Sequence, residues 1–71
     1  MRAIEPDMVL GKEAIDGEGD SLGEIVDVGL YTHDRVKFLV VQAPGRSVPV
    51  RTVGVDLITS VSPDEVRVRV V

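Results

Sequence analysis

Short runs of valine and other β-branched residues, separated by turn residues, are the feature that most constrains the fold of this chain. β-Branched side chains are stiff at χ1 and pack well on a pleated surface, so they favour strands. Clusters of glycine, proline, aspartate and serine recur roughly every eight to twelve positions, the spacing typical of a small barrel or sandwich. No stretch has the pattern of a three-turn helix. The sequence therefore predicts one all-β domain over residues 1–71.

Six strands are expected, joined by short turns. They are predicted at Val9–Ile15, Leu22–Tyr31, Val36–Gln42, Ser47–Val50, Leu57–Val61 and Glu65–Val71. Pro49 cannot donate to a ladder, which favours an edge or a bulge for the fourth strand. Arg51–Asp56 is expected to form an irregular or 3₁₀ turn. The pairing of Thr52–Val61 stays open.

The second strand has an irregular alternation of apolar residues. Ile25 lies on one parity, whereas Val28 and Leu30 lie on the other. Either Glu24 faces inward or a β-bulge near Val26–Asp27 switches the faces. The bulge is the preferred interpretation, because a closed barrel needs bends and bulges produce them.

The third strand is apolar on both of its faces. Val36, Phe38 and Val40 share one face, and Leu39 and Val41 lie on the other. A strand that is apolar on both faces is usually covered on both sides. This strand therefore has more apolar surface than a one-sided sheet needs.

Two explanations for the surplus at Leu39 and Val41 stay open. The N-terminal segment Ala3–Pro6 could fold over these side chains. Alternatively, they form an interface, either by packing of a sheet face or by strand addition at an edge.

The last strand alternates valine with arginine. Val66, Val68 and Val70 alternate with Arg67 and Arg69, a pattern that indicates one buried face and one wet face. As a terminal strand, Val66–Val71 is also a candidate edge for pairing. The candidate interface residues are Leu39, Val41, Val66, Val68, Val70 and Val71.

A second subunit would also help a chain of this size to remain folded. A core of 71 residues rarely supplies more than roughly 3–5 kcal/mol of net stability. Small domains often add a disulfide, a metal or a second subunit, and a disulfide is excluded because the chain has no cysteine. We therefore expect self-association, as a homodimer or a higher assembly.

The charge and aromatic content disfavour nucleic acid as a partner. The formal net charge is −4, so the chain is repelled by phosphate backbones and anionic lipids. Tyr31 and Phe38 are too few rings for a single-strand stacking platform. The alternative is an RNA-binding wall of basic side chains. Its candidate contacts are Arg46, Arg51, Arg67 and Arg69.

No constellation of residues supports catalysis or a cofactor. His33 is the single histidine and sits in a polar turn, without the nucleophile and orienting group that catalysis needs. Asp16, Glu18, Asp20 and Asp27 resemble a calcium loop only superficially, because serine replaces the required glycine at position six. We expect neither enzymatic activity nor a metal or cofactor.

The glycines near the start of the second strand are expected to serve the backbone. Gly17, Gly19 and Gly23 precede no helix that could hold a phosphate. Gly23 is expected to permit a close approach of strands or a bend.

A membrane-spanning segment is not expected. The longest apolar run, Phe38–Val41, is far shorter than the roughly 20 residues that a bilayer requires. The acidic N-terminus lacks the apolar stretch of a signal peptide. From these two features we expect the chain to be cytoplasmic.

Several of these segments together resemble a known family. Leu10–Asp16 and Gly19–Val28 look like the opening of a PRC-barrel domain. Val36–Val41 and Val48–Val50 are similar to the third strand and the short valine–proline strand of that family. The resemblance covers roughly residues 8–70 and implies a compact six-stranded barrel without catalytic residues. Asp27 matches a recurring acidic position, expected to pin the bend in the second strand.

The resemblance also implies a role. PRC-barrel domains occur in the photosynthetic reaction-centre H subunit, in a ribosome-maturation factor and as single barrels in archaea. The length of this chain fits the single barrels best, some of which resemble dimeric components of the cell-division machinery. We therefore expect a cytoplasmic assembly adaptor that self-associates and binds a larger protein complex. The alternative is a ribosome-maturation or RNA-processing factor.

Overall fold

The chain folds into strands wherever its β-branched residues are densest. The computed structural model describes residues 4–31, 35–43, 45 and 50–69. Its elements are η1 (Pro6–Met8), β1 (Glu13–Ile15), β2 (Ser21–Leu30), β3 (Val36–Gln42), β4 (Val50–Gly54), η2 (Val55–Leu57), β5 (Ile58–Val61) and β6 (Glu65–Val68). Apart from two 3₁₀ turns, the described residues contain no helix. The predicted all-β fold with six strands is confirmed.

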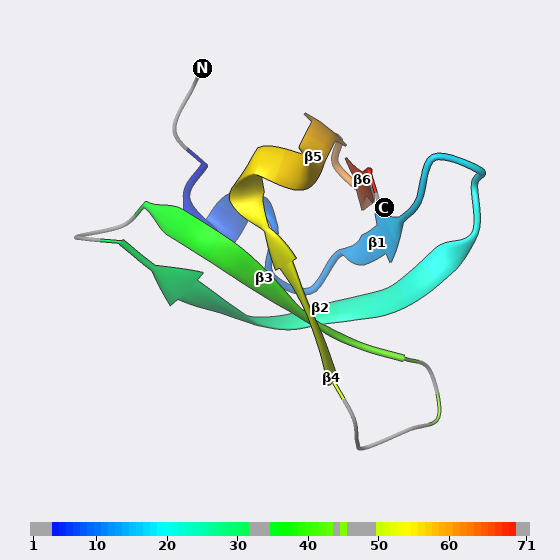
Figure 1. Cartoon of the computed structure of the whole chain (residues 1–71), viewed down its shortest axis with the longest axis horizontal. Coiled ribbons are helices and arrows are strands. Elements are labelled where there is room, and N and C mark those ends of the chain that lie inside the picture. Colours follow the sequence, from blue (N-terminus) through cyan, green and yellow to red (C-terminus); the bar gives the residue numbers. More distant parts are fainter. Residues whose placement is uncertain (1–3, 32–34, 44, 46–49, 70–71) are drawn as a thin grey trace.

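The six strands form one curled sheet, in the shape of a half-barrel. Their order is β4-β3-β2-β1-β6-β5. Only the β1–β6 pair is parallel, and every other pair is antiparallel. β4 and β5 are the two edges of the sheet, and the short turn η2 joins them (Figure 1). This arrangement answers the open question about residues 52–61, because β4 pairs with β3 and β5 pairs with β6.

The concave side of the curled sheet holds the apolar core. The core residues come from every strand except β5, together with Val9 from the N-terminal turn. They are Val9, Ala14, Ile25, Val36, Leu39, Val41, Val53, Val66 and Val68. Burial of valine, leucine and isoleucine side chains stabilises such a core by about 1.5–3 kcal/mol each.

The N-terminal segment covers part of this core. The Val36 amide donates to the Ile4 carbonyl oxygen at 2.9 Å, and Ile4 and Met8 pack against the core cluster. Leu39 and Val41 belong to the same cluster. Of the two explanations for these residues, the structure therefore supports burial inside the chain.

A β-bulge in β2 switches the faces of that strand, as predicted. Ile25 pairs with Val41 and Asp27 pairs with Val40, which leaves Val26 as an extra residue. The Val26 side chain is 43% exposed, whereas Ile25 is fully buried. The Asp27 carboxylate accepts the Val28 amide at 2.8 Å, directly beside the bulge.

A second irregularity corrects the predicted face of Val36. Leu30 pairs with Val36 and Gly29 pairs with Phe38, so Lys37 is an extra residue on β3. This offset turns Val36 to the core side, away from the face that Phe38 occupies. Val36 is accordingly only 3% exposed.

Gly23 lies where the backbone of β2 passes close to the end of β3. Its φ is +130°, and a Cβ atom at this position would overlap the Gln42 carbonyl oxygen. Only glycine tolerates both the dihedral angle and the contact. The predicted close approach of strands at Gly23 is confirmed.

Two predicted strand boundaries are wrong for local reasons. β1 begins at Glu13 instead of Val9, because Val9 closes the η1 turn and Gly11 has a φ of +81°. The predicted turn at Arg51–Asp56 is a strand as far as Gly54, and only Val55–Leu57 is a 3₁₀ turn. Residues 47–49 of the predicted fourth strand lie outside the described residues.

Within the described ranges, no helix has the length and apolar character needed to cross a bilayer.

Candidate interaction surface

The side chains predicted to form an interface lie inside the molecule. Leu39 and Val66 are fully buried, and Val41 and Val68 are each 1% exposed. None of these four side chains is available to a partner, so the expectation that they form an interface is wrong. Val70 and Val71, the other two candidates, lie outside the described residues.

The reason for this error is the position of β6 in the sheet. β6 was expected to be an edge because it comes last in the sequence. It lies between β1 and β5 and pairs with both of them. The parallel pairing with β1 joins segments about fifty residues apart in the chain, and strand patterns do not encode pairing partners.

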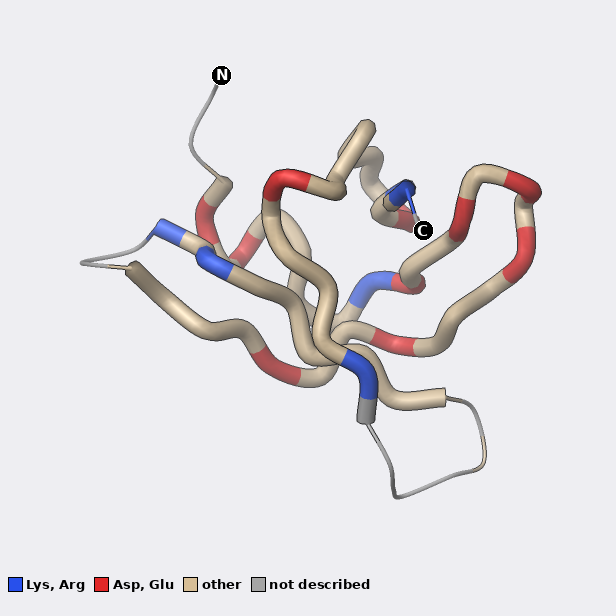
Figure 2. Tube along the Cα trace, in the orientation of Figure 1, with Lys and Arg blue, Asp and Glu red and all other residues tan. Residues whose placement is uncertain are grey.

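The arginines proposed as RNA contacts do not form one basic wall. Arg51 lies on β4, whereas Arg67 lies on β6 and Arg69 directly follows that strand, toward the other end of the strand order. Basic residues are spread over several parts of the described trace (Figure 2). Arg67 Nε donates to Glu65 Oε2 at 2.8 Å, so part of its charge is already paired. Arg46 lies outside the described residues. Phosphate binding requires several unpaired basic groups on one surface.

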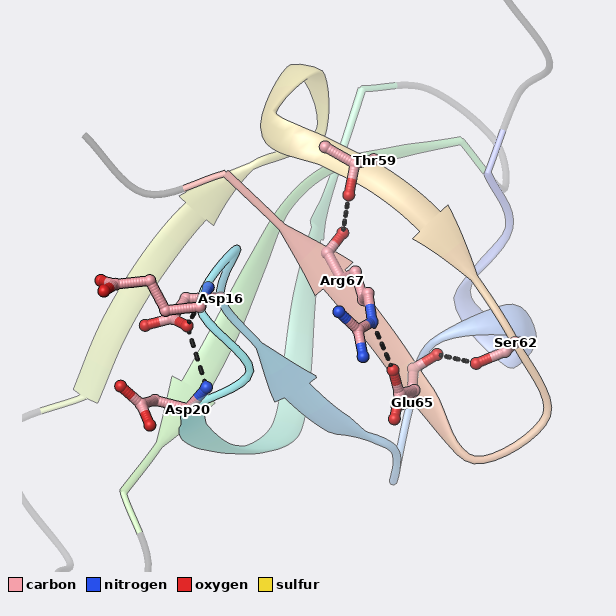
Figure 3. Close-up of polar contacts among 7 residues, drawn as sticks. Asp16, Asp20, Thr59, Ser62, Glu65 and Arg67 are labelled. Atoms are coloured by element: carbon pink, nitrogen blue, oxygen red, sulfur yellow. Dashed lines mark hydrogen bonds and ion pairs between the residues drawn. The ribbon is translucent and has the colours of Figure 1, made fainter.

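The acidic β1–β2 turn uses its first carboxylate for its own backbone. Asp16 Oδ1 accepts the amides of Glu18 and Asp20, each at 2.9 Å (Figure 3). This is an Asx-type turn, in which an aspartate side chain stabilises the following loop. Among the described residues, no group of three or more histidine, aspartate or glutamate side chains could hold a metal ion.

An open groove lies between this turn and the β5–β6 hairpin. Its volume is about 430 Å³, and its lining residues are Asp16, Gly17, Glu18, Thr59, Val68 and Arg69. The charged groups in its lining are the Asp16 and Glu18 carboxylates and the Arg69 guanidinium, and Val68 adds an apolar residue. Its lining residues include no histidine and no serine.

Within the described part of the chain, no second strand pairs with the outer side of β4. The direction of its backbone groups follows from the hydrogen bonds of Ile25. The Ile25 amide donates to the Lys12 carbonyl oxygen, and the Ile25 carbonyl oxygen accepts the Gly11 amide, both at 2.9 Å. Both backbone groups of Ile25 therefore point away from β3. Ile25 and Val41 therefore form a non-hydrogen-bonded pair between β2 and β3. Because the backbone groups of Val41 do not bond to β2, they point to the other side of β3, toward β4.

The same alternation continues into β4. Val41 pairs with Arg51 and Leu39 pairs with Val53, so the backbone groups of Arg51 and Val53 bond to β3. The backbone amide and carbonyl of Thr52, between them, point outward from the sheet. By the same parity the backbone groups of Val50 and the amide of Gly54 also point outward. The Gly54 carbonyl oxygen is already used, because Gly54 is the N-cap of η2 and its carbonyl accepts the first bond of that turn. β4 thus offers outward amides at Val50, Thr52 and Gly54 and outward carbonyl groups at Val50 and Thr52, along a regular strand of five residues.

The sheet face next to this edge is partly apolar. Phe38 and Val40 lie on β3 with their side chains on the face opposite the core, and both are half-buried. Phe38 pairs with Gly54, and Val40 pairs with Thr52. An edge with free backbone groups beside apolar side chains is the arrangement used for peptide binding by strand addition.

The opposite edge is protected. In β5 the register shifts between Ile58 and Ser60, which leaves Thr59 as an extra residue. The Thr59 hydroxyl donates to the Arg67 carbonyl oxygen at 3.2 Å (Figure 3). Bulges twist an edge strand and disfavour its pairing with another chain. β4 has no such shift in its pairing with β3.

Sequence reasoning missed β4 as an interaction surface. The available signal lies in residues 51–56, where valines at positions 53 and 55 alternate with Thr52, Gly54 and Asp56. This is a strand pattern with period two. Instead, an irregular or 3₁₀ turn is predicted over Arg51–Asp56.

Comparison with known proteins identifies no family for this chain. No family model matches the chain, and no curated protein matches it. The function is therefore inferred from the edge strand and its surroundings.

Proposed function

We propose that this chain is a non-enzymatic interaction module that binds protein by strand addition at β4. The observation that carries this proposal is the outward direction of the Val50 and Thr52 backbone groups and of the Gly54 amide on a regular edge strand. A partner strand would satisfy these groups with ladder hydrogen bonds. Phe38 and Val40 would give the partner an apolar surface next to the edge.

A protein partner fits this edge better than a nucleic acid does. Arg51 is the one charged residue within Val50–Gly54, and strand addition uses backbone groups that every protein segment has. The dispersed arginines and the net charge of −4 oppose binding to a phosphate backbone.

The resemblance of the sequence to single PRC-barrel domains supports a more specific role. Under this proposal the module is a cytoplasmic adaptor that docks onto a larger assembly, such as the archaeal cell-division machinery. The cysteine-free composition is compatible with a reducing compartment.

The experiment compares the tagged wild-type chain with the Thr52→Pro variant in a native lysate. Proline removes the outward amide of Thr52 without removing a bond to β3, so the variant is expected to fold. Dispersed amide resonances in a ¹⁵N–¹H spectrum would confirm its fold. The proposal predicts a partner that resists nuclease and is lost with Thr52→Pro. Ribosomal proteins that disappear with nuclease would instead support the RNA alternative.

A further inference from the structure

We infer that the strand that pairs with β4 is β4 of a second copy of this chain, in an antiparallel arrangement centred on Thr52. The inference rests on the proposed function, since it names the partner of the same edge. In this arrangement each Thr52 would exchange both backbone hydrogen bonds with its symmetry mate. Each Val50 would pair with the Gly54 of the other copy.

The outward backbone groups of β4 are arranged symmetrically, which suits a two-fold interface. Val50 and Gly54 lie two positions on either side of Thr52, and all three have backbone groups directed outward. A two-fold axis through Thr52 therefore matches each Thr52 amide with the Thr52 carbonyl oxygen of the other copy, and each Gly54 amide with the Val50 carbonyl oxygen of the other copy. Isologous interfaces of this kind are the commonest in soluble homo-oligomers.

The side chains select this register over its neighbours. With Thr52 at the centre, each Arg51 lies opposite Val53 of the other copy, so no like charges face each other. A register centred on Arg51 would place the two guanidinium groups directly opposite, which is destabilising. A register centred on Val53 would leave Val50 and Arg51 without partners within the strand. A threonine pair at the centre is also a favourable cross-strand pair.

The remainder of the molecule favours the same partner. A single core of this size provides a small net stability, and β4 lies next to that core through Val53. Pairing of β4 would add ladder bonds at an edge strand whose Val53 side chain belongs to the core. β5 is unsuited to the same role because of its bulge at Thr59.

The absence of cysteine permits a clean test by disulfide trapping. The variants are Thr52→Cys on β4 and, as the matched control, Ser60→Cys on β5, the other edge strand. Both native side chains are exposed. Hydrogen-bonded antiparallel pairs have Cα atoms about 5.5 Å apart, which lies within the range of disulfides. In a glutathione buffer, Thr52→Cys is expected to form a covalent dimer several-fold faster than Ser60→Cys.

A second measurement uses no cysteine. Analytical ultracentrifugation of the wild-type chain at up to high micromolar concentration is expected to show a dimer. Thr52→Pro is expected to raise the dimer dissociation constant by at least about tenfold, because one donor is lost from each copy.

The outcomes separate this inference from the proposed function. Equal crosslinking of the two cysteine variants, or a wild-type chain that stays monomeric, would overturn the β4–β4 dimer. If such a monomer still captured a partner that Thr52→Pro loses, β4 would bind a different protein and the proposed function would stand. If Thr52→Pro retained every partner, strand addition at β4 would itself be wrong.

Discussion

The ring of Phe38 lies against Gly29, its cross-strand partner on β2, so closely that a Cβ atom at Gly29 would overlap the ring carbons. Aromatic side chains often cover glycines on neighbouring strands in this way. The contact fixes the ring on the outer face of the sheet, beside the edge strand that we propose as the binding surface. It also explains why a bulky aromatic residue on that face is only half exposed.

The Phe38–Gly29 contact predicts that Gly29→Ala is destabilising. The added methyl group would displace the ring, and overpacking of this kind costs about 1–3 kcal/mol. Gly17→Ala is the matched control, because a Cβ atom at Gly17 meets nothing within 4 Å and its φ is not positive. Urea denaturation of both variants measures the difference. Equal stabilities would contradict the close contact of the ring.

Gly23→Ala is expected to have a larger effect than any other glycine substitution in the described chain. The new Cβ atom would overlap the Gln42 backbone, which cannot move as a side chain does, and φ is +130°. We expect a loss of more than about 3 kcal/mol, enough to unfold a domain of this size. Gly19→Ala has a φ of +89° and open space, so it measures the backbone strain alone. Circular dichroism melts of the two variants separate strain from overlap.

Leu39 is expected to behave as a core residue. Leu39→Ala should reduce the free energy of unfolding by about 2–5 kcal/mol, because the side chain is fully buried in the cluster. Val26→Ala removes an apolar side chain that is 43% exposed on the bulge, and we expect a change below about 1 kcal/mol. Thermal unfolding is the measurement. A folded Leu39→Ala variant with native stability and impaired association would contradict this and indicate that Leu39 contacts a partner.

The Asp16 carboxylate is expected to stabilise the β1–β2 turn without any metal. Asp16→Ala should cost about 0.5–2 kcal/mol, because the Glu18 and Asp20 amides lose their acceptor. Asp16→Asn retains an acceptor oxygen and should lose less. Calcium should leave the melting temperature of the wild-type chain unchanged. A rise of several degrees with calcium would contradict this role of Asp16.

The sequence was sufficient to predict the fold class and several local features, because these depend on residues that are close together in the chain. The parity change between Ile25 and Val28 predicted the bulge, and Gly23 was placed correctly at a close approach. Val36–Gln42 was predicted with the bounds that β3 has in the structure.

The sites were harder to predict, because they depend on which strands pair. Leu39 and Val41 appear surplus only if the sheet has one apolar face, and the curl of the sheet turns them into the core. The parallel pairing of β1 with β6 makes the last strand internal, and β4 is an edge of the sheet because β3 is its one partner in the strand order. Neither relationship follows from a pattern within one strand.

Strand addition at β4 requires that the Thr52 amide points outward from an open edge. Hydrogen exchange measured by NMR at two chain concentrations tests it most directly. At low concentration we expect the Thr52 amide to exchange rapidly and the Arg51 and Val53 amides to be protected by β3. At high concentration the Thr52 amide should become protected as copies pair. A Thr52 amide that is already protected in the dilute chain, beside unprotected Arg51 and Val53 amides, would contradict the account.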